Sequence, residues 1–221
     1  MKKLLSLIVI LSSLFTLASC GNRKYDEAEV KAAAEELILS SEMLNEIFWG
    51  KGIPHFEDTS TSNGYYFEAS YSALREYGFY TIAEMETLTR ATFSSDYADK
   101  IIETCTSSIS DESGVQILAR YYQKYTDEKM TEPECIMVYS KAEPLLVDKV
   151  EYNYESLRVS HSKKKTVFVT IDCHITTEDG KAQDKTLTIG LVEEDAGWRI
   201  DTPTYARYDR DYYDKIENKE D

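Results

Sequence analysis

The chain has 221 residues, with 25 Lys and Arg against 40 Asp and Glu, which gives a net charge of −15 at pH 7. This length suits one good-sized domain, and such acidity argues against nucleic acid binding and against a surface that lies flat on anionic lipid. Tyrosine is abundant, with 17 residues, and tyrosine rings serve both as core packing and as recognition side chains.

The N-terminus has the features of an export signal. Two lysines precede an apolar run over residues 4–17, which has the length of a signal-peptide core and is too short to span a membrane. The run ends in Leu17-Ala18-Ser19-Cys20-Gly21, which resembles the lipobox of bacterial lipoproteins. The resemblance implies cleavage of a signal peptide, residues 1–19, and acylation of Cys20, which anchors the exported chain in the lipid bilayer at the outer face of the bacterial cytoplasmic membrane. An ordinary secretory peptide is the alternative.

The next part of the chain predicts a helical half, residues 27–113. A short polar tether over 20–26 leads into a helix over 27–48, where apolar residues recur at helical spacing. An aromatic strand is expected over 65–69, and a connection over 70–78. Thr81-Ile82-Ala83-Glu84 has the spacing of a capping box and predicts a helix to about residue 92. Ser94 and Ser95 predict the cap of another helix, whose apolar stripe includes Cys105.

Beyond residue 113 the period becomes alternating, and a sheet half is predicted over 114–207. The cleanest strand is 167–175, and Asp179-Gly180 predicts the turn after it. A slip of phase predicts a β-bulge at Glu155 or Ser156. Residues 208–221 are charged and predicted to fray. Helices followed by hairpin-linked strands predict a single α+β domain over 27–207, with N-terminal helices packed on a curved, bulged antiparallel sheet.

Two segments carry a family resemblance. The strand over 187–192 and the following Gly197-Trp198-Arg199-Ile200-Asp201 resemble the final hairpin of the nuclear transport factor 2-like superfamily, whose domains are cone-shaped. The layout of Phe48-Trp49, Tyr65-Tyr66, residues 80–86 and residues 93–97 is similar to that of bacterial inhibitors of cell-wall D,L-endopeptidases. This resemblance implies an envelope protein that occludes a peptidoglycan hydrolase.

The connection over residues 49–63 is long for a compact domain, and long loops are often functional. Its aromatic residues and carboxylates predict a binding edge for a cationic envelope protein, such as a cell-wall hydrolase. The candidate residues are Trp49, Phe56, Glu57 and Asp58, with Tyr65 and Tyr66 beyond the connection. The alternative is that these aromatic residues tuck under the sheet.

Asp172 and His174 form a second candidate site because they lie two apart on one predicted strand and share a face. A carboxylate beside an imidazole suits a small-ligand site or an enzyme that uses the interior of a cone, whereas a polar row on a sheet is also typical of its solvated side. Cys105, Cys135 and Cys173 fall on apolar phases and are predicted to be buried. No metal-ligand spacing, cofactor motif or nucleophile elbow is found, so the sequence favours a non-catalytic binding module.

Overall fold

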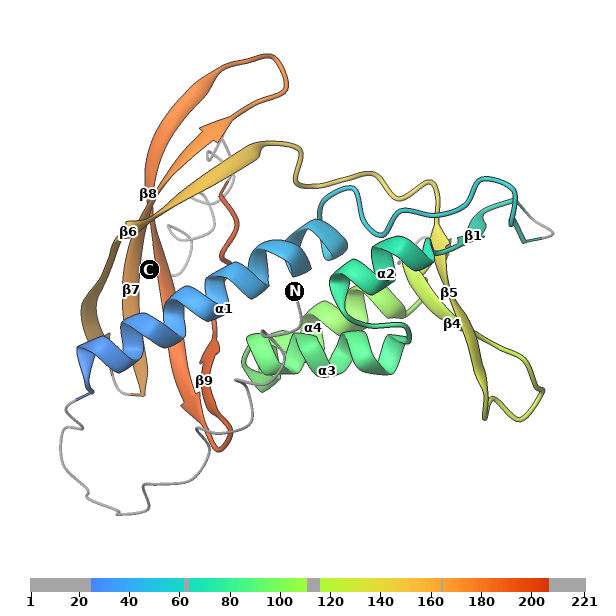
Figure 1. Cartoon of the computed structure of the whole chain (residues 1–221), viewed down its shortest axis with the longest axis horizontal. Helices are drawn as coiled ribbons and strands as arrows, with labels where there is room; N and C mark the ends of the chain where they lie inside the picture. Colours follow the sequence, from blue (N-terminus) through green and yellow to red (C-terminus); the bar gives the residue numbers. More distant parts are fainter. Residues whose placement is uncertain (1–24, 62–63, 111–115, 164, 207–221) are drawn as a thin grey trace.

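The computed structural model describes residues 25–61, 64–110, 116–163 and 165–206. The fold is α+β, as predicted: helices come first and antiparallel strands dominate the later part of the chain (Figure 1). The helices are α1 (Glu27–Phe48), α2 (Tyr71–Tyr77), α3 (Ile82–Thr92) and α4 (Ser95–Thr106). None of the described helices is long and apolar enough to cross a membrane.

The named strands form three antiparallel groups, which differs from the single sheet expected. A three-stranded sheet has the order β1-β5-β4 and a four-stranded sheet the order β6-β7-β8-β9, while β2 and β3 form a pair. The two larger sheets lie toward opposite ends of the molecule with helices between them (Figure 1). The bounds are β1 (Tyr66–Glu68), β2 (Ile109–Ser110), β3 (Gln116–Ile117), β4 (Tyr121–Tyr125), β5 (Pro133–Tyr139), β6 (Lys149–Lys163), β7 (Thr166–Thr176), β8 (Ala182–Glu194) and β9 (Gly197–Ile200).

Helix α1 begins at Glu27, as predicted, directly after the residues predicted to be tether. The Asp26 carboxylate accepts hydrogen bonds from the main-chain N–H groups of Ala28 and Glu29 and so caps the helix. The Tyr25 ring packs edge-on against Trp198, with ring centroids 5.3 Å apart. Residues 25 and 26 therefore belong to the folded domain.

The segment between residues 70 and 94 contains one helix more than the sequence predicted. Residues 71–77 form α2, which ends at Gly78 in the left-handed conformation (φ 82°), where glycine is the favoured residue. The capping box of α3 is confirmed: Glu84 N–H donates to Thr81, and the Glu84 carboxylate accepts from the Thr81 N–H. Ser94 precedes α4 as predicted, but its hydroxyl donates to Asp201 rather than to the helix.

The main core lies between the helices and the inner face of the four-stranded sheet. Buried side chains of α1, such as Ile38 and Leu44, share this core with Val169 and Ile171 of β7. The predicted bulge is confirmed, because the β6–β7 register shifts between Asn153 and Arg158. All three cysteines expected to be buried are buried, and no disulfide forms within the described residues. A second, smaller cluster of Tyr66, Cys135 and Met137 covers one face of the three-stranded sheet.

Candidate binding surface

The C-terminus of α1 fixes where the predicted loop begins. Arg120, just before β4, donates from Nη1 to the Phe48 carbonyl (2.9 Å) and from Nη2 to the Gly50 carbonyl (2.6 Å). The Tyr121 hydroxyl donates to the Ile47 carbonyl at 2.6 Å. These side chains satisfy carbonyl groups that a helix end leaves without intrahelical donors, and the guanidinium charge opposes the negative end of the helix dipole.

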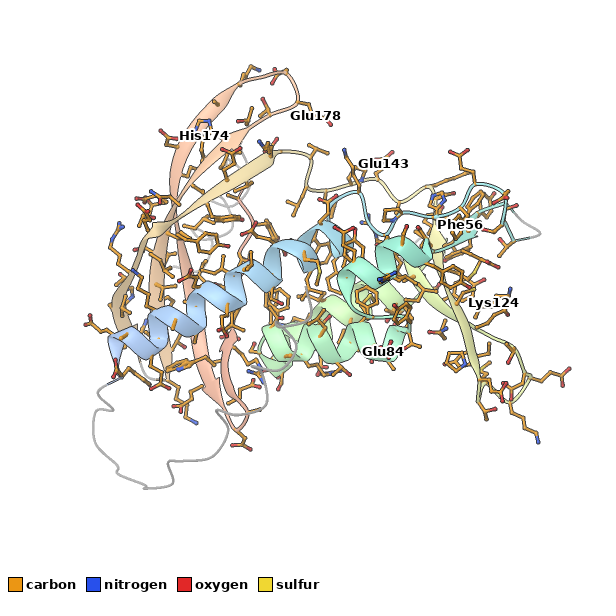
Figure 2. All side chains as sticks on the ribbon, in the orientation of Figure 1. Phe56, Glu84, Lys124, Glu143, His174 and Glu178 are labelled. Atoms are coloured by element: carbon orange, nitrogen blue, oxygen red, sulfur yellow. The ribbon has the colours of Figure 1, made fainter. Side chains whose placement is uncertain are left out.

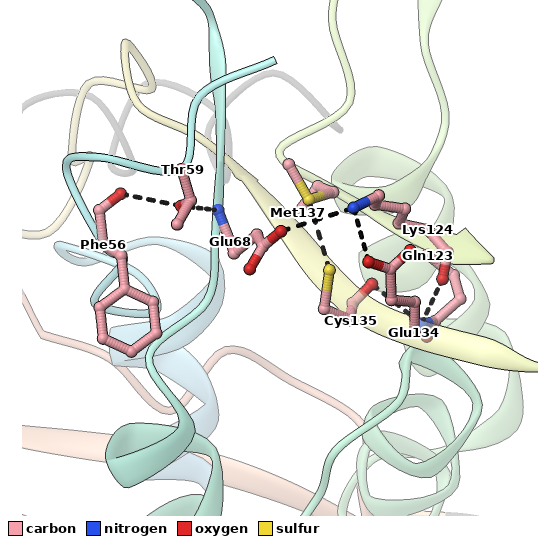
Figure 3. A network of polar contacts seen from close by, with 8 residues as sticks. All are labelled: Phe56, Thr59, Glu68, Gln123, Lys124, Glu134, Cys135 and Met137. Atoms are coloured by element: carbon pink, nitrogen blue, oxygen red, sulfur yellow. Dashed lines mark hydrogen bonds and ion pairs between the residues drawn. The ribbon is translucent and has the colours of Figure 1, made fainter. Parts of the chain in front are cut away.

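From this point the loop over residues 49–61 runs along the outer edge of β1. The Phe56 N–H donates to the Glu68 carbonyl (3.0 Å), and the Thr61 N–H donates to the Tyr66 carbonyl (2.8 Å). In the other direction, the Glu68 N–H donates to the Thr59 hydroxyl at 3.0 Å (Figure 3). The loop therefore covers the edge of the sheet and is tied to β1 by two main-chain hydrogen bonds and one bond to a side-chain hydroxyl.

Phe56 of this anchored loop and Tyr71, the first residue of α2, form an exposed aromatic pair. Their rings lie 6.2 Å apart, and 38% of Phe56 and 54% of Tyr71 are exposed to solvent. Glu57 and Asp58 follow Phe56, are exposed, and form no ion pair with any described residue. Three of the predicted residues thus stand together on the surface, with Tyr71 as an aromatic neighbour that the sequence did not single out.

Four tyrosines form a row of ring contacts across the three-stranded sheet. Tyr65 contacts Tyr139 (6.4 Å between centroids), Tyr139 contacts Tyr66 (5.4 Å), and Tyr66 contacts Tyr122 (4.8 Å). The Lys141 ammonium lies 4.4 Å from the centre of the Tyr65 ring. Tyr65 is exposed, whereas Tyr66 is buried and donates its hydroxyl to the Ala119 carbonyl at 2.6 Å. Of the two predicted tyrosines, therefore, Tyr65 is exposed and Tyr66 is buried in the sheet.

A salt-bridge network joins β1, β4 and β5 of the same sheet (Figure 3). The Lys124 ammonium lies 2.7 Å from a Glu134 oxygen and 3.5 Å from a Glu68 oxygen. The ligand atoms of Glu68, Glu134 and Cys135 lie within 4.8 Å of one another, and the single positive charge of Lys124 offsets one of the two carboxylate charges. Burial, with the nearby Glu68 carboxylate, raises the pKa of the Cys135 thiol to about 11, so the thiol is protonated at neutral pH. Lys124, Glu68 and Glu134 therefore form a partly exposed ion network.

Trp49 differs from the other predicted contact residues. It is only partly exposed and packs against the main core, its main-chain carbonyl accepts hydrogen bonds from Leu145 and Leu146, and its indole Nε1 is buried without a partner among the described residues. Ile53, in the same loop, is fully buried. The alternative prediction, that loop aromatics tuck inward, therefore holds for Trp49 but not for Phe56.

Asp172 and His174 lie far from this surface, on the four-stranded sheet (Figure 2 labels His174 and Phe56). Their side chains point away from the core-facing Ile171 and Cys173, so they are on the solvated face and not on the face toward the helices. His174 Nδ1 lies 2.7 Å from an Asp184 oxygen, and the two side chains are 47% and 89% exposed. A broad depression of about 710 Å³ includes Asp172, His174 and Asp184 in its wall. Because both side chains are exposed, solvent strongly screens the electrostatic attraction between His174 and Asp184.

The lipidation residue Cys20 and the signal peptide over 1–19 lie outside the described residues, as does the predicted tail over 208–221. No family model matches the chain, and no curated protein matches it.

Proposed function

We propose that the chain is an extracytoplasmic lipoprotein anchored to the membrane through Cys20, and that its domain is a non-catalytic module that binds an envelope protein. The observation that carries the proposal is the exposed contact between Phe56 and Tyr71 of α2. Phe56, Glu57 and Asp58 belong to a loop that main-chain hydrogen bonds tie to β1. A preorganised loop loses little conformational entropy on binding. Aromatic anchors with a charged rim are typical of protein interfaces.

The partner proposed is a protein with a cationic face, and a cell-wall hydrolase is the first choice. Two exposed carboxylates without an ion pair attract a positive partner and leave no internal pair to break. Inhibition in this arrangement needs only steric cover of the hydrolase site and no reaction by the lipoprotein itself.

The test is a pull-down from solubilised bacterial envelope with the mature protein as bait. We expect a cell-wall hydrolase to be retained, and its retention to fall at least tenfold when Glu57 and Asp58 are both replaced by Lys. A matched control replaces Glu35 and Glu36, an exposed acidic pair on α1, in the same way. The purified hydrolase should digest peptidoglycan more slowly with the parent than with the loop variant. Equal loss of retention in both variants, or no hydrolase in the parent eluate, contradicts the proposal.

A small-ligand site or an enzyme at Asp172 and His174 is the alternative function. The 710 Å³ depression favours it, but a general base needs shielding from water to gain strength from its carboxylate partner. His174→Ala separates the two proposals. The variant should bind the hydrolase as the parent does, and it should lose any ligand binding or catalysis at the depression around Asp172 and His174.

A further inference from the structure

Only a short stretch of sequence separates the proposed lipid anchor from the described structure. Residues 21–24 lie between Cys20 and Tyr25, the first described residue. The five residue steps from Cys20 to Tyr25 span at most about 17 Å when fully extended, and the polar headgroup region of one leaflet takes up about 5–8 Å of that length. Tyr25 of an acylated chain is therefore held within about 12 Å of the bilayer surface.

Tyr25 also determines which end of the domain is close to the bilayer. Its ring packs edge-on against Trp198 of β9, with ring centroids 5.3 Å apart. The residue after Trp198 pairs with Val192 of β8, and Val192 pairs with Thr166, the first residue of β7. Thr166 in turn pairs with Lys163, the last residue of β6. The start of the described chain and the β6–β7 turn therefore lie at the same end of the four-stranded sheet (Figure 1).

The β6–β7 turn belongs to a cationic segment of an acidic chain. Residues 156–171 contain four Lys and Arg and no Asp or Glu, whereas the whole chain has a net charge of −15. Lys163 and Lys165 are exposed and form no ion pair with a described residue. The neighbouring β8–β9 turn contains Glu193 and Asp195, so the two turns at this end of the sheet have opposite charge.

We propose that Lys163 and Lys165 contact the phosphate groups of anionic phospholipids in the bilayer to which Cys20 anchors the chain. The inference rests on the proposed lipid anchor and adds an orientation of the domain on the membrane. The attraction between a lysine and an anionic membrane surface falls off within a Debye length, about 8 Å at physiological ionic strength. It therefore acts only on an end of the domain that is held close to the lipid, and the short connection to Cys20 holds this end there.

The charge of the remaining surface supports the same orientation. The chain has an excess of Asp and Glu over Lys and Arg, and anionic lipid repels such a surface. Helix α1 begins at the end that carries the two lysines and leads to the Phe56 loop at its other end. The domain thus contacts the bilayer through Lys163 and Lys165, and the Phe56 loop stays free for its protein partner.

The test uses the lipoprotein purified from bacterial membranes and inserted into preformed vesicles. One set of vesicles is pure phosphatidylcholine, and the other also contains the anionic phosphatidylglycerol. Mass spectrometry of the N-terminal peptide first determines whether Cys20 is acylated. An unacylated Cys20 overturns the anchor together with the orientation, whereas the measurements on the acylated protein test the orientation alone.

The first of these measurements follows the reaction of each lysine with a water-soluble acylating reagent by peptide mass spectrometry. We expect Lys163 and Lys165 to react at least fivefold more slowly on the anionic vesicles than on phosphatidylcholine, because lipid phosphates pair with their ammonium groups. Lys51 and Lys129 are exposed lysines outside the four-stranded sheet and serve as internal controls. They should react equally fast on both vesicles. Unchanged rates at Lys163 and Lys165, or equal slowing of the controls, overturns the proposal.

The second measurement removes the two charges. In a Trp49→Phe background Trp198 is the only tryptophan, and energy transfer from it to a dansyl-labelled phospholipid reports how close this end lies to the bilayer. Replacing Lys163→Gln together with Lys165→Gln should lower the transfer on anionic vesicles at least twofold, to its value on phosphatidylcholine. The same replacement of the two control lysines should leave it unchanged, and circular dichroism checks that each variant is folded. Equal transfer in both double variants overturns the proposal.

Discussion

Replacing Arg120 by Met tests whether one side chain joins α1 to the proposed binding loop. Methionine keeps much of the aliphatic stem but removes the donors to the Phe48 and Gly50 carbonyls and to the Tyr121 hydroxyl. A hydrogen bond made by a charged group contributes about 1.5–3 kcal/mol. Since water can reach part of this half-buried site, we expect a total loss of about 3 kcal/mol rather than the full sum for the lost bonds.

The loss of stability is measured by thermal and urea unfolding. A domain of this size loses roughly 2–4 °C in melting temperature per kcal/mol, so Arg120→Met should lower it by about 6–12 °C. Arg158→Met is the matched control, because Arg158 is exposed and lies 3.9 Å from Asp172 in a surface ion pair. Its loss should stay below about 1 kcal/mol. Equal losses in the two variants would refute the reasoning that Arg120 stabilises the helix end.

Three other measurements address the core, a titrating group and the thiols. Trp198→Ala should cost about 3–5 kcal/mol in urea unfolding, and a loss below about 1 kcal/mol would contradict its place in the core. Burial raises the pKa of Glu42, so the stability it contributes is complete below its ordinary pKa of 4.5 and is lost as the pH rises through the folded pKa. Glu42→Gln should therefore raise the melting temperature at pH 7 and not at pH 3.5, and a pH-independent effect contradicts this. In native protein a maleimide should leave Cys105, Cys135 and Cys173 unmodified, and in guanidinium it should label all three; fast native labelling would refute their burial.

Elements with a local signal were predicted from the sequence. The apolar spacing of α1, the capping box at Thr81 and Glu84 and the phase slip in β6 all depend on neighbouring residues, and each is confirmed. α2 was missed because seven residues show too little of the helical period. Strand partners were also missed: Tyr66 pairs with Tyr139 in a sheet apart from β6–β9. Alternation along one strand does not specify which distant strand lies beside it.

The candidate site was also predictable only where it depends on neighbouring residues in the sequence. The exposure of Phe56, Glu57 and Asp58 follows from their place in a polar loop. The inward packing of Trp49 depends on distant residues, because Leu145 and Leu146 donate to its carbonyl and lie far along the chain. Ser41 and Asn45 are polar residues at buried helical positions of α1. Their partner Thr204 comes from the other end of the chain.

The length of α1 has a mechanical consequence. This unbroken helix of 22 residues rises by about 33 Å, begins beside the four-stranded sheet and leads directly into the loop over residues 49–61 (Figure 1). If the N-terminus is anchored and a partner is held at Phe56, as proposed above, tension between them acts along the helix axis. It shears α1 across the strands and loads the whole buried stripe from Val30 to Phe48 at once, instead of peeling contacts away one by one. A domain loaded in this way resists pulling forces better than one whose strands unzip from an edge.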